Sequence, residues 1–198
     1  IDNGAFKAEI VGVETPEGLF DIDDGVRRGG TMEAMASVKT LEEGGTITAA
    51  NASQMTDGAS GVLVASEAAI KRFNLKPMAR IVNLTVTAGD PVIMLEEPIP
   101  ATRRAFERSG LSLNDIDLFE VNEAFAAIPM AWLKAIGADP AKLNVNGGAI
   151  ALGHPLGASG TKLMSTLIHA LKARGKRYGL QTMCEGGGVA NVTIVEAL

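Results

Sequence analysis

Residues 178–195 read YGLQTMCEGGGVANVTIV, two runs suited to β-strands with the sequence CEGGG between them. The first run covers residues 178–183, and the second, rich in β-branched side chains, covers residues 189–195. Only a few residues join the two runs. That spacing permits an antiparallel hairpin but is too short for the crossover that parallel strands require. The segment therefore predicts the antiparallel part of a sheet.

Upstream of this hairpin, strands and helices are expected to alternate. The expected strands cover residues 81–87, 117–121 and 143–145, and the expected helices cover residues 101–108, 123–136 and 159–174. The last helix is the clearest, because Leu163, Leu167 and Leu171 share one face. Together with the hairpin, this order predicts an α/β fold with a mixed five-stranded sheet. In such sheets, ligands gather at strand ends and in the loops that lead into helices.

The first part of the sequence is less regular. Glycines interrupt acidic stretches in residues 1–55, where only residues 31–41 have helical spacing, so this part is expected to be rich in loops. Residues 61–65 form a compact apolar strand candidate. Residues 66–73 predict a helix with Ser66 as its N-cap. A boundary is expected near Pro77.

Composition indicates a globular protein without a broad cationic surface. The 198 residues are 46% hydrophobic and 21% charged, with a net charge of -5, so we expect no nucleic-acid partner. No apolar run approaches the roughly 18 residues of a membrane span. The single cysteine cannot form an internal disulfide, which suits a reducing compartment. No secretory signal is visible at Ile1, so a cytoplasmic location is expected, or an organellar one if a transit peptide has been lost.

Three loops that follow expected strands carry a polar group among small residues: Asn122 in VNEAFA, His154 in NGGAIALGHPLGASG and Cys184 in MCEGGG. We hypothesise that these loops converge. The glycines around His154 permit close approach of the backbone to a ligand, and the imidazole can accept or donate a proton near neutral pH. The glycines after Cys184 leave backbone N–H groups accessible, as an oxyanion hole requires, beside a thiol that suits a nucleophile or a base.

Each of these residues also has a structural interpretation. Asn122 is a good N-cap for the helix expected over residues 123–136, and base rates favour that role, although a capping amide can still hold a water beside a reacting carbonyl. A lone histidine such as His154 is more often structural than catalytic. Cys184 is, on base rates, a buried inert thiol. His169, within an expected helix and without glycines around it, is expected to be a packing or surface residue.

Several other kinds of site do not fit the sequence. GHPLGASGTK cannot be laid over a phosphate-binding loop, and residues 186–188 lack the continuation of a dinucleotide-binding fingerprint. There is no G-x-S-x-G elbow, and two separated histidines with one cysteine make no zinc set. We therefore expect no metal and no cofactor, and neither nucleotide nor serine hydrolysis.

These motifs, taken in order, resemble those of the thiolase family, the acetyl-CoA and acyl-CoA C-acetyltransferases. The resemblance rests on NEAFA at residues 122–126, GGAIALGHPLGASG at residues 147–160 and CEGGG at residues 184–188. TITAANASQMTDGAS, at residues 46–60, resembles the family's segment beside coenzyme A. The resemblance extends over nearly the whole chain, but it matches only the later half of a usual thiolase subunit.

The resemblance implies a layered α/β/α fold and a division of the chain into three parts. Residues 1–55 would be part of a loop domain with a segment facing coenzyme A. Residues 56–76 would be the last strand and helix of the N-terminal thiolase domain, and residues 77–198 would be the C-terminal thiolase domain.

The resemblance also implies roles for the residues that match. His154 would activate the acyl-accepting cysteine and contribute to an oxyanion hole, in which Asn122 positions a water. Cys184 would remove a proton from the α-carbon of acetyl-CoA in synthesis and protonate the leaving enolate in cleavage. Gly186 would offer its backbone N–H to the second oxyanion hole. The residues expected to line the coenzyme A and thioester path are Ser53, Ala124, Phe125 and, more weakly, Arg27. Ala50 stands where the family often has glycine.

One catalytic part of a thiolase has no counterpart here. The family takes the acyl group on a cysteine of the N-terminal half, whereas Cys184 matches the other role. We therefore expect acyl-CoA and coenzyme A as small-molecule partners, a companion chain or N-terminal half that carries the nucleophilic cysteine, and a dimer or tetramer of thiolase units. Two alternatives stay open: a β-ketoacyl synthase relative, and a non-catalytic CoA-binding or assembly subunit.

Overall fold

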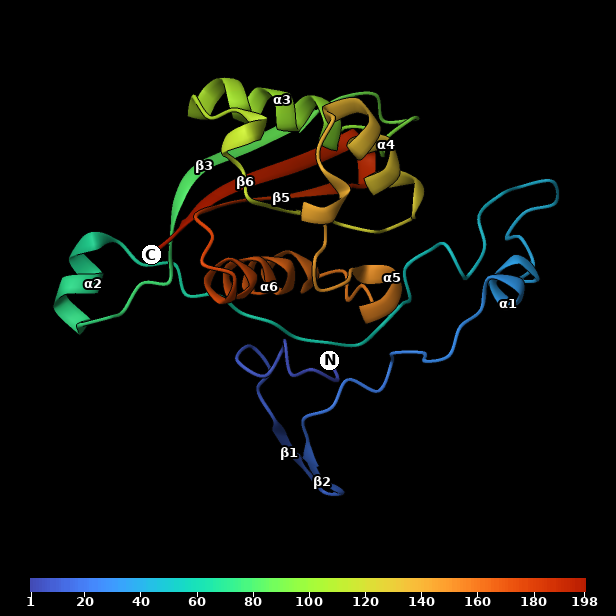
Figure 1. The fold of residues 1–198 in the computed structure, drawn as a ribbon, viewed down its shortest axis with the longest axis horizontal. Coiled ribbons are helices and arrows are strands. Elements are labelled where there is room, and N and C mark those ends of the chain that lie inside the picture. The colour runs from blue at the N-terminus through green and yellow to red at the C-terminus, as the bar shows by residue number, and fades with distance from the viewer.

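The computed structural model describes all 198 residues, and residues 79–197 form three layers (Figure 1). A four-stranded sheet lies in the middle. Helices α3 (Pro98–Ser109) and α4 (Ala127–Ile136) lie on one face of the sheet, and α5 (Ala149–Leu152) and α6 (Ser159–Ala173) lie on the other. The structure therefore has the expected layered α/β/α arrangement.

The sheet is mixed, with the order β3-β6-β5-β4. Its strands are β3 (Ala79–Ala88), β4 (Leu118–Val121), β5 (Tyr178–Glu185) and β6 (Val189–Ala197). β6 is antiparallel to both of its neighbours, and β4 and β5 are parallel. The predicted hairpin is confirmed: the short turn Gly186–Gly188 joins β5 to β6, and Glu185 pairs with Val189.

The expected strand over residues 143–145 is wrong, and so is the count of five strands. Leu143 makes one isolated parallel bridge to Phe119. Asn144 then turns into the left-handed region, with a φ of 44°, which ends the extended run. Its side-chain amide takes over the role of a strand: Oδ1 accepts from the Val121 N–H at 2.9 Å, and Nδ2 donates to the Val121 carbonyl at 3.0 Å. One side chain thus completes the edge of β4.

The core lies on both faces of the sheet. Between the sheet and α3 and α4, Phe119 packs against Trp132 with ring centroids 5.2 Å apart, and Trp132 Nε1 donates to Thr102 Oγ1 at 2.9 Å. On the other face, Leu167 and Leu171 of α6 pack on the sheet, as their helical spacing predicts. α6 begins where expected, at residue 159. Three short 3-10 turns complete the regular structure: Leu113–Asp115, Pro140–Lys142 and Gly186–Gly188.

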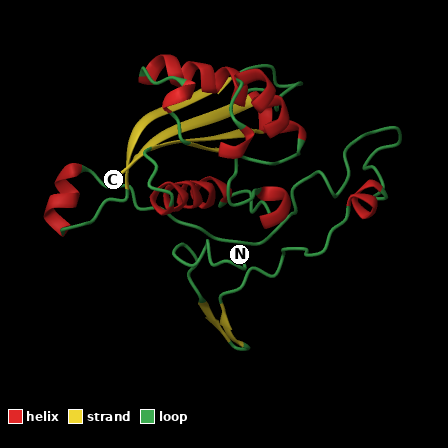
Figure 2. Ribbon diagram, in the orientation of Figure 1, coloured by secondary structure: helices red, strands yellow, loops and turns green.

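Residues before the sheet are mostly loop (Figure 2). They contain a small antiparallel pair, β1 (Val13–Thr15) and β2 (Gly18–Phe20), and a helix α1 (Met32–Ala36) shorter than expected. The helix expected over residues 66–73 is confirmed as α2 (Glu67–Phe73), with Ser66 Oγ accepting from the Ala69 N–H at 3.2 Å.

The strand expected over residues 61–65 does not form. The segment is extended loop, and the side chains of Leu63 and Val64 are 80% and 71% exposed. A strand needs a neighbour that supplies hydrogen bonds to its backbone, and no strand of this chain lies beside the segment. Its apolar, β-branched composition therefore does not produce a strand here.

No helix in this structure combines the length and the hydropathy needed to cross a bilayer.

Candidate functional site

The parallel pairing of β4 and β5 brings Asn122 and Cys184 to the same edge of the sheet. Val121 pairs with Thr182, and the Asn122 N–H donates to the Thr182 carbonyl at 3.0 Å. Asn122 therefore follows directly on the end of β4, and Cys184 lies two residues beyond its neighbour Thr182, near the end of β5. The expected convergence of these two loops is present in the structure.

His154 joins this edge from a different loop. Its Nε2 lies 3.3 Å from Asn122 Nδ2. Asn122 is only 1% exposed, and its Oδ1 has no hydrogen-bond partner. A buried amide oxygen without a partner carries a desolvation cost of about 1–3 kcal/mol, so this atom has the character of an acceptor waiting for a water or a ligand donor.

The N-cap role expected for Asn122 is wrong. α4 begins only at Ala127, and no side chain caps it. Residues 123–126 are not helical, because their backbone groups bond to a segment far upstream in the sequence. The Ser53 N–H donates to the Ala124 carbonyl at 3.0 Å, and the Ala126 N–H donates to the Asn51 carbonyl at 2.8 Å. These bonds free the Asn122 amide from capping, so that it can contact His154.

The same upstream segment also brings together three of the residues expected to line the thioester path. Ala52 forms an isolated antiparallel bridge with Phe125, next to the Ser53–Ala124 bond. Ser53, Ala124 and Phe125 are therefore neighbours, and each is partly exposed.

The backbone of His154 is held by that segment as well. Its N–H is shared between the Gln54 carbonyl at 3.0 Å and Thr56 Oγ1 at 3.2 Å. Gly153, just before it, has a φ of 83° and a ψ of 162°, and a Cβ at this position would overlap the Thr56 hydroxyl. Only glycine adopts this conformation without strain, so the glycine before the histidine is required by the close approach of Thr56.

The imidazole of His154 is fixed on its second nitrogen by Ser159. Nδ1 lies 2.5 Å from Ser159 Oγ, which is buried at 2% exposure and also contacts the Pro155 carbonyl at 3.0 Å. Because Asn122 Nδ2 can only donate, Nε2 accepts in this arrangement, and Nδ1 carries the hydrogen toward Ser159. Burial lowers the pKa of His154, and the charge of Lys162 lowers it further. The ring is therefore a neutral base with its lone pair facing Asn122.

Cys184 is a free, buried thiol with 9% exposure. Burial is the main cause that raises the pKa of this thiol. No hydrogen bond links its sulfur to His154, so within this chain the thiol and the imidazole are not a bonded pair. In the resting state Cys184 therefore carries its proton.

The glycine turn after Cys184 is supported by the loop that follows β3. Gly187 has a φ of 77°, and its N–H is directed at Met94 Sδ, 3.3 Å away. The Gly89 N–H donates to the Gly188 carbonyl at 2.9 Å, and a Cβ on Gly188 would press on the Asp90 backbone. At Gly186 there is open space where a side chain would stand. A ligand can thus approach the Gly186 backbone, while its two successors are held in place.

The side chain of Arg27, another expected site residue, is bonded to no other residue of the site. Its side chain is exposed and makes no hydrogen bond or ion pair. The segment itself is tied to the site, because Gln54 Nε2 donates to the Gly25 carbonyl at 3.4 Å and to the Ile150 carbonyl at 3.3 Å. The structure thus brings the backbone near Arg27 toward the His154 loop, but not its guanidinium.

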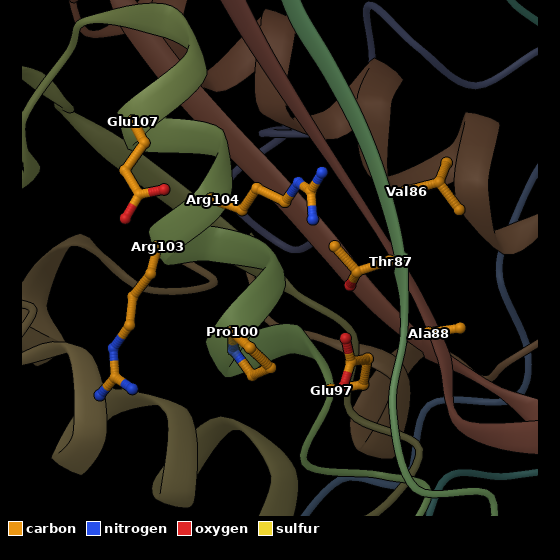
Figure 3. A pocket seen from close by; sticks show the side chains of 8 residues that line it. All are labelled: Val86, Thr87, Ala88, Glu97, Pro100, Arg103, Arg104 and Glu107. Atoms are coloured by element: carbon orange, nitrogen blue, oxygen red, sulfur yellow. The ribbon is translucent and has the colours of Figure 1, made fainter.

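A separate hollow lies on the other side of the sheet, between β3 and α3 (Figure 3). Its lining includes Glu97, Arg103, Arg104 and Glu107, and the close view shows these side chains along α3 and at its start, across from the strand residues Val86, Thr87 and Ala88. None of the expected site residues belongs to it. Its two arginines and Glu107 are exposed, so it is an open surface depression and not an extension of the site.

Comparison with known proteins agrees with the motifs. A family profile described as "Thiolase, C-terminal domain" matches residues 75–197, and one described as "Thiolase, N-terminal domain" matches residues 1–68. A steroid 3-ketoacyl-CoA thiolase of Mycobacterium tuberculosis is 59% identical over 195 residues, which are 98% of this chain and 48% of that protein. An acetyl-CoA acetyltransferase of Shinella zoogloeoides is 45% identical over 201 residues, 99% of this chain and 51% of that protein.

Solved structures give the same result. The human mitochondrial 3-ketoacyl-CoA thiolase in complex with CoA superposes with a TM-score of 0.96 at 42% identity, over 100% of this chain and 50% of that chain. The acetyl-CoA acetyltransferase of Bacillus anthracis superposes with a TM-score of 0.91 at 38% identity, over 100% of this chain and 51% of that chain. The chain spans about half the length of the relatives it matches. Its fold is thiolase-like, and the resemblance of its motifs is confirmed: the chain belongs to the thiolase family.

Proposed function

We propose that this chain forms the later part of a thiolase subunit, which condenses acetyl-CoA with an acyl group or cleaves a 3-ketoacyl-CoA with coenzyme A. The observation that carries the proposal is the Asn122–His154 pair, with 3.3 Å between Nδ2 and Nε2, at the sheet edge where β5 presents Cys184. Every relative named above is a thiolase or an acetyl-CoA acetyltransferase.

The central chemical step is the formation or discharge of a thioester enolate. The α-proton of acetyl-CoA is weakly acidic, so its removal needs hydrogen bonds to the oxygen that becomes negative. In condensation, the Cys184 thiolate would take the α-proton. The carbonyl oxygen would accept hydrogen bonds from a water on Asn122 and from His154, which would be protonated at Nε2 after it has activated the acyl-accepting cysteine as a base. In cleavage, the Cys184 thiol would give the proton back to the enolate carbon. The raised pKa of Cys184 keeps the thiol protonated, which suits the second direction.

Two further parts of the site follow from this arrangement. Gly186, which has open space beside it, would donate its backbone N–H to the oxygen of the second tetrahedral centre. Removing one such donor costs about 3–4 kcal/mol of transition-state stabilisation. The chemistry needs no cofactor beyond the coenzyme A thioester itself, which is a substrate.

The coenzyme A path would run along the upstream segment. Ser53 would contact the pantetheine arm, and Ala124 and Phe125, its neighbours in the structure, would line the thioester tunnel. Arg27, exposed and without a partner, would reach the nucleotide end. This assignment is supported by the contacts among the first three residues and by a human relative whose solved structure holds CoA.

The acyl-accepting cysteine would come from a companion half. Cys184 is the only cysteine of the sequence. The extended apolar segment at Leu63 and Val64, exposed and without a neighbouring strand, would pair with that half as the last strand of an N-terminal thiolase domain. Residues 1–55 would then be part of the loop domain and residues 77–198 the C-terminal domain of the unit. Two or four such units would associate.

A free thiol that must stay reduced suits a reducing compartment, so we place this protein in the cytoplasm, or in an organelle reached with a transit peptide.

Reconstitution with a cysteine-bearing half tests the function. The assembled protein should condense acetyl-CoA supplied as the free thioester, without a carrier protein. His154→Ala and Cys184→Ser should each abolish turnover. Unchanged rates in both variants would favour the alternative of a non-catalytic CoA-binding or assembly subunit. Dependence on a carrier protein in place of coenzyme A would favour a β-ketoacyl synthase relative.

A further inference from the structure

A lysine of α6 reaches into the loop that carries His154. Lys162 Nζ donates to the carbonyl oxygens of Leu152 and Gly153, each at 3.2 Å, and these are the two residues directly before His154. None of the ion pairs of the structure involves Lys162. Its hydrogen bonds therefore go to the backbone of the His154 loop and not to a carboxylate partner.

The ammonium occupies this position at an electrostatic cost. Lys162 is partly buried, and burial lowers its pKa, while the carboxylates of Asp23, Glu120 and Glu9 raise it. Of these, Glu120 lies on β4 and is 1% exposed, and the other two lie in the loops of the first part of the chain. A partly desolvated charge without a close counter-ion is unfavourable unless its donors are used, and two of the three donors of Lys162 hold the His154 loop.

Ser159 lies three residues before Lys162, so both side chains project from the same face of α6. Ser159 Oγ holds Nδ1 of the imidazole at 2.5 Å, and Lys162 holds the backbone that leads into the same residue. The beginning of α6 therefore fixes His154 at two points, one on the ring and one on the chain.

We propose that Lys162 is a positioning residue for His154: by holding the Leu152 and Gly153 carbonyls it keeps the imidazole Nε2 within reach of Asn122. The proposal rests on the proposed function, in which His154 is the base that activates the acyl-accepting cysteine and then holds the thioester oxygen. The positive charge of Lys162 also favours the neutral imidazole, which lowers the pKa of His154. The carboxylates of Asp23, Glu120 and Glu9 raise the pKa of Lys162, so they favour the charged form of the lysine that produces this effect.

The test uses three substitutions at Lys162 in the assembled protein. Lys162→Met removes both the charge and the donors, Lys162→Gln keeps a donor without the charge, and Lys162→Arg keeps both. Lys172→Met is the matched control, because Lys172 is an exposed lysine in the last turn of the same helix. Each variant is assayed for turnover against pH and for the temperature of unfolding.

A second readout observes His154 directly, without activity. The chain has two histidines, so it can be labelled with ¹³C-histidine and assembled with an unlabelled companion half, and His169→Gln assigns the two signals. The Cδ2 and Cε1 shifts then report the tautomer and the pKa of His154. We expect the Nδ1–H tautomer in the unsubstituted protein.

Lys162→Met should raise the pKa of His154, shift the acid limb of the rate profile upward in pH by the same amount, and lower turnover by about 10²-fold. Lys162→Arg should restore most of the rate and the original titration, and Lys172→Met should change neither.

Unchanged His154 shifts and titration in Lys162→Met would overturn the proposal, including the case in which turnover falls only in step with the unfolding temperature. Failure of the proposed function gives a different result: His154→Ala would keep its rate, while the effect of Lys162 on the His154 signals would remain.

Discussion

Asn144 holds the strand end that carries Asn122, and its loss should be costly. Its amide bonds both backbone groups of Val121, and Nδ2 also donates to Glu123 Oε1 at 2.9 Å. Val121 is 1% exposed, so water does not easily replace the amide. Asn144→Ala should therefore destabilise the sheet edge and displace Asn122.

The magnitude follows from two contributions. Each of the two buried Val121 groups left without a partner costs about 1–3 kcal/mol, which gives at least about 2 kcal/mol together. Alanine at the left-handed φ of 44° adds about 1–2 kcal/mol. The sum is about 3 kcal/mol or more, which lowers the unfolding temperature by about 6–12 °C for a protein domain of this size.

The assay is thermal and chemical unfolding of the assembled protein with three variants. Asn144→Gly tolerates the positive φ and isolates the loss of the amide, so it should fall between Asn144→Ala and the unsubstituted protein. Asn146→Ala is the control, because Asn146 makes only one long bond, at 3.4 Å to Arg174. A cost below about 1 kcal/mol for Asn144→Ala, equal to that of Asn146→Ala, would refute the reasoning.

Three further outcomes are expected. Cys184→Ser should slow exchange of the acetyl-CoA α-protons with deuterated water by at least about 10²-fold, as mass spectrometry can measure, and unslowed exchange would exclude Cys184 as the base. Gly153→Ala should lower the free energy of unfolding by about 1–3 kcal/mol, because the φ of this residue is 83° and a Cβ here would overlap Thr56. Gly157→Ala is the control and should lower it much less, because a Cβ there would meet open space. Equal losses in the two variants would contradict this account. Burial raises the pKa of Glu120 well above its ordinary value of 4.5, so the folded protein favours the protonated carboxyl. The contribution of Glu120 to stability is therefore greatest below pH 4.5 and is lost as the pH rises toward the raised pKa. Glu120→Gln should flatten this part of the stability profile, and a profile with the original slope would show that another group causes it.

The elements that local pattern predicts well are those whose bonds are local. α6 has an apolar face that repeats with helical spacing, and the short connection after Cys184 leaves a hairpin as the only simple pairing. The strands expected over residues 61–65 and 143–145 failed for the opposite reason. A strand depends on backbone pairing with a distant neighbour. The first segment has no such neighbour, whereas in the second Asn144 turns to a positive φ and bonds Val121 of β4 through its side chain and not its backbone.

In the candidate site too, local sequence predicts some residues, and distant contacts determine the others. Asn122, His154 and Cys184 stand out because each is a polar group among small residues that follow an expected strand. Ser159 and Lys162 were missed because the sequence shows them only as positions of a helix. The signal that was available is that both are polar and precede the first buried leucine, Leu163, at the beginning of α6. Their contacts with the His154 loop depend on tertiary packing, which periodicity does not reveal.

Gln54 and Thr56 were also missed as supports of the His154 backbone. They lie far upstream of His154 in the sequence, and their bonds require the loop-rich first part of the chain to pass beside both the 122–126 and the 147–160 segments. The resemblance indicated that this segment faces coenzyme A. Its contacts with the catalytic loops appear only in the structure.

The most direct measurement is a crystal structure of the assembled protein soaked with acetyl-CoA. The thioester oxygen should lie about 3 Å from His154 Nε2 and from a water held by Asn122, with the methyl carbon facing the Cys184 sulfur. Acetyl-CoA bound elsewhere, or aliphatic side chains that fill the space between these three residues, would contradict the account.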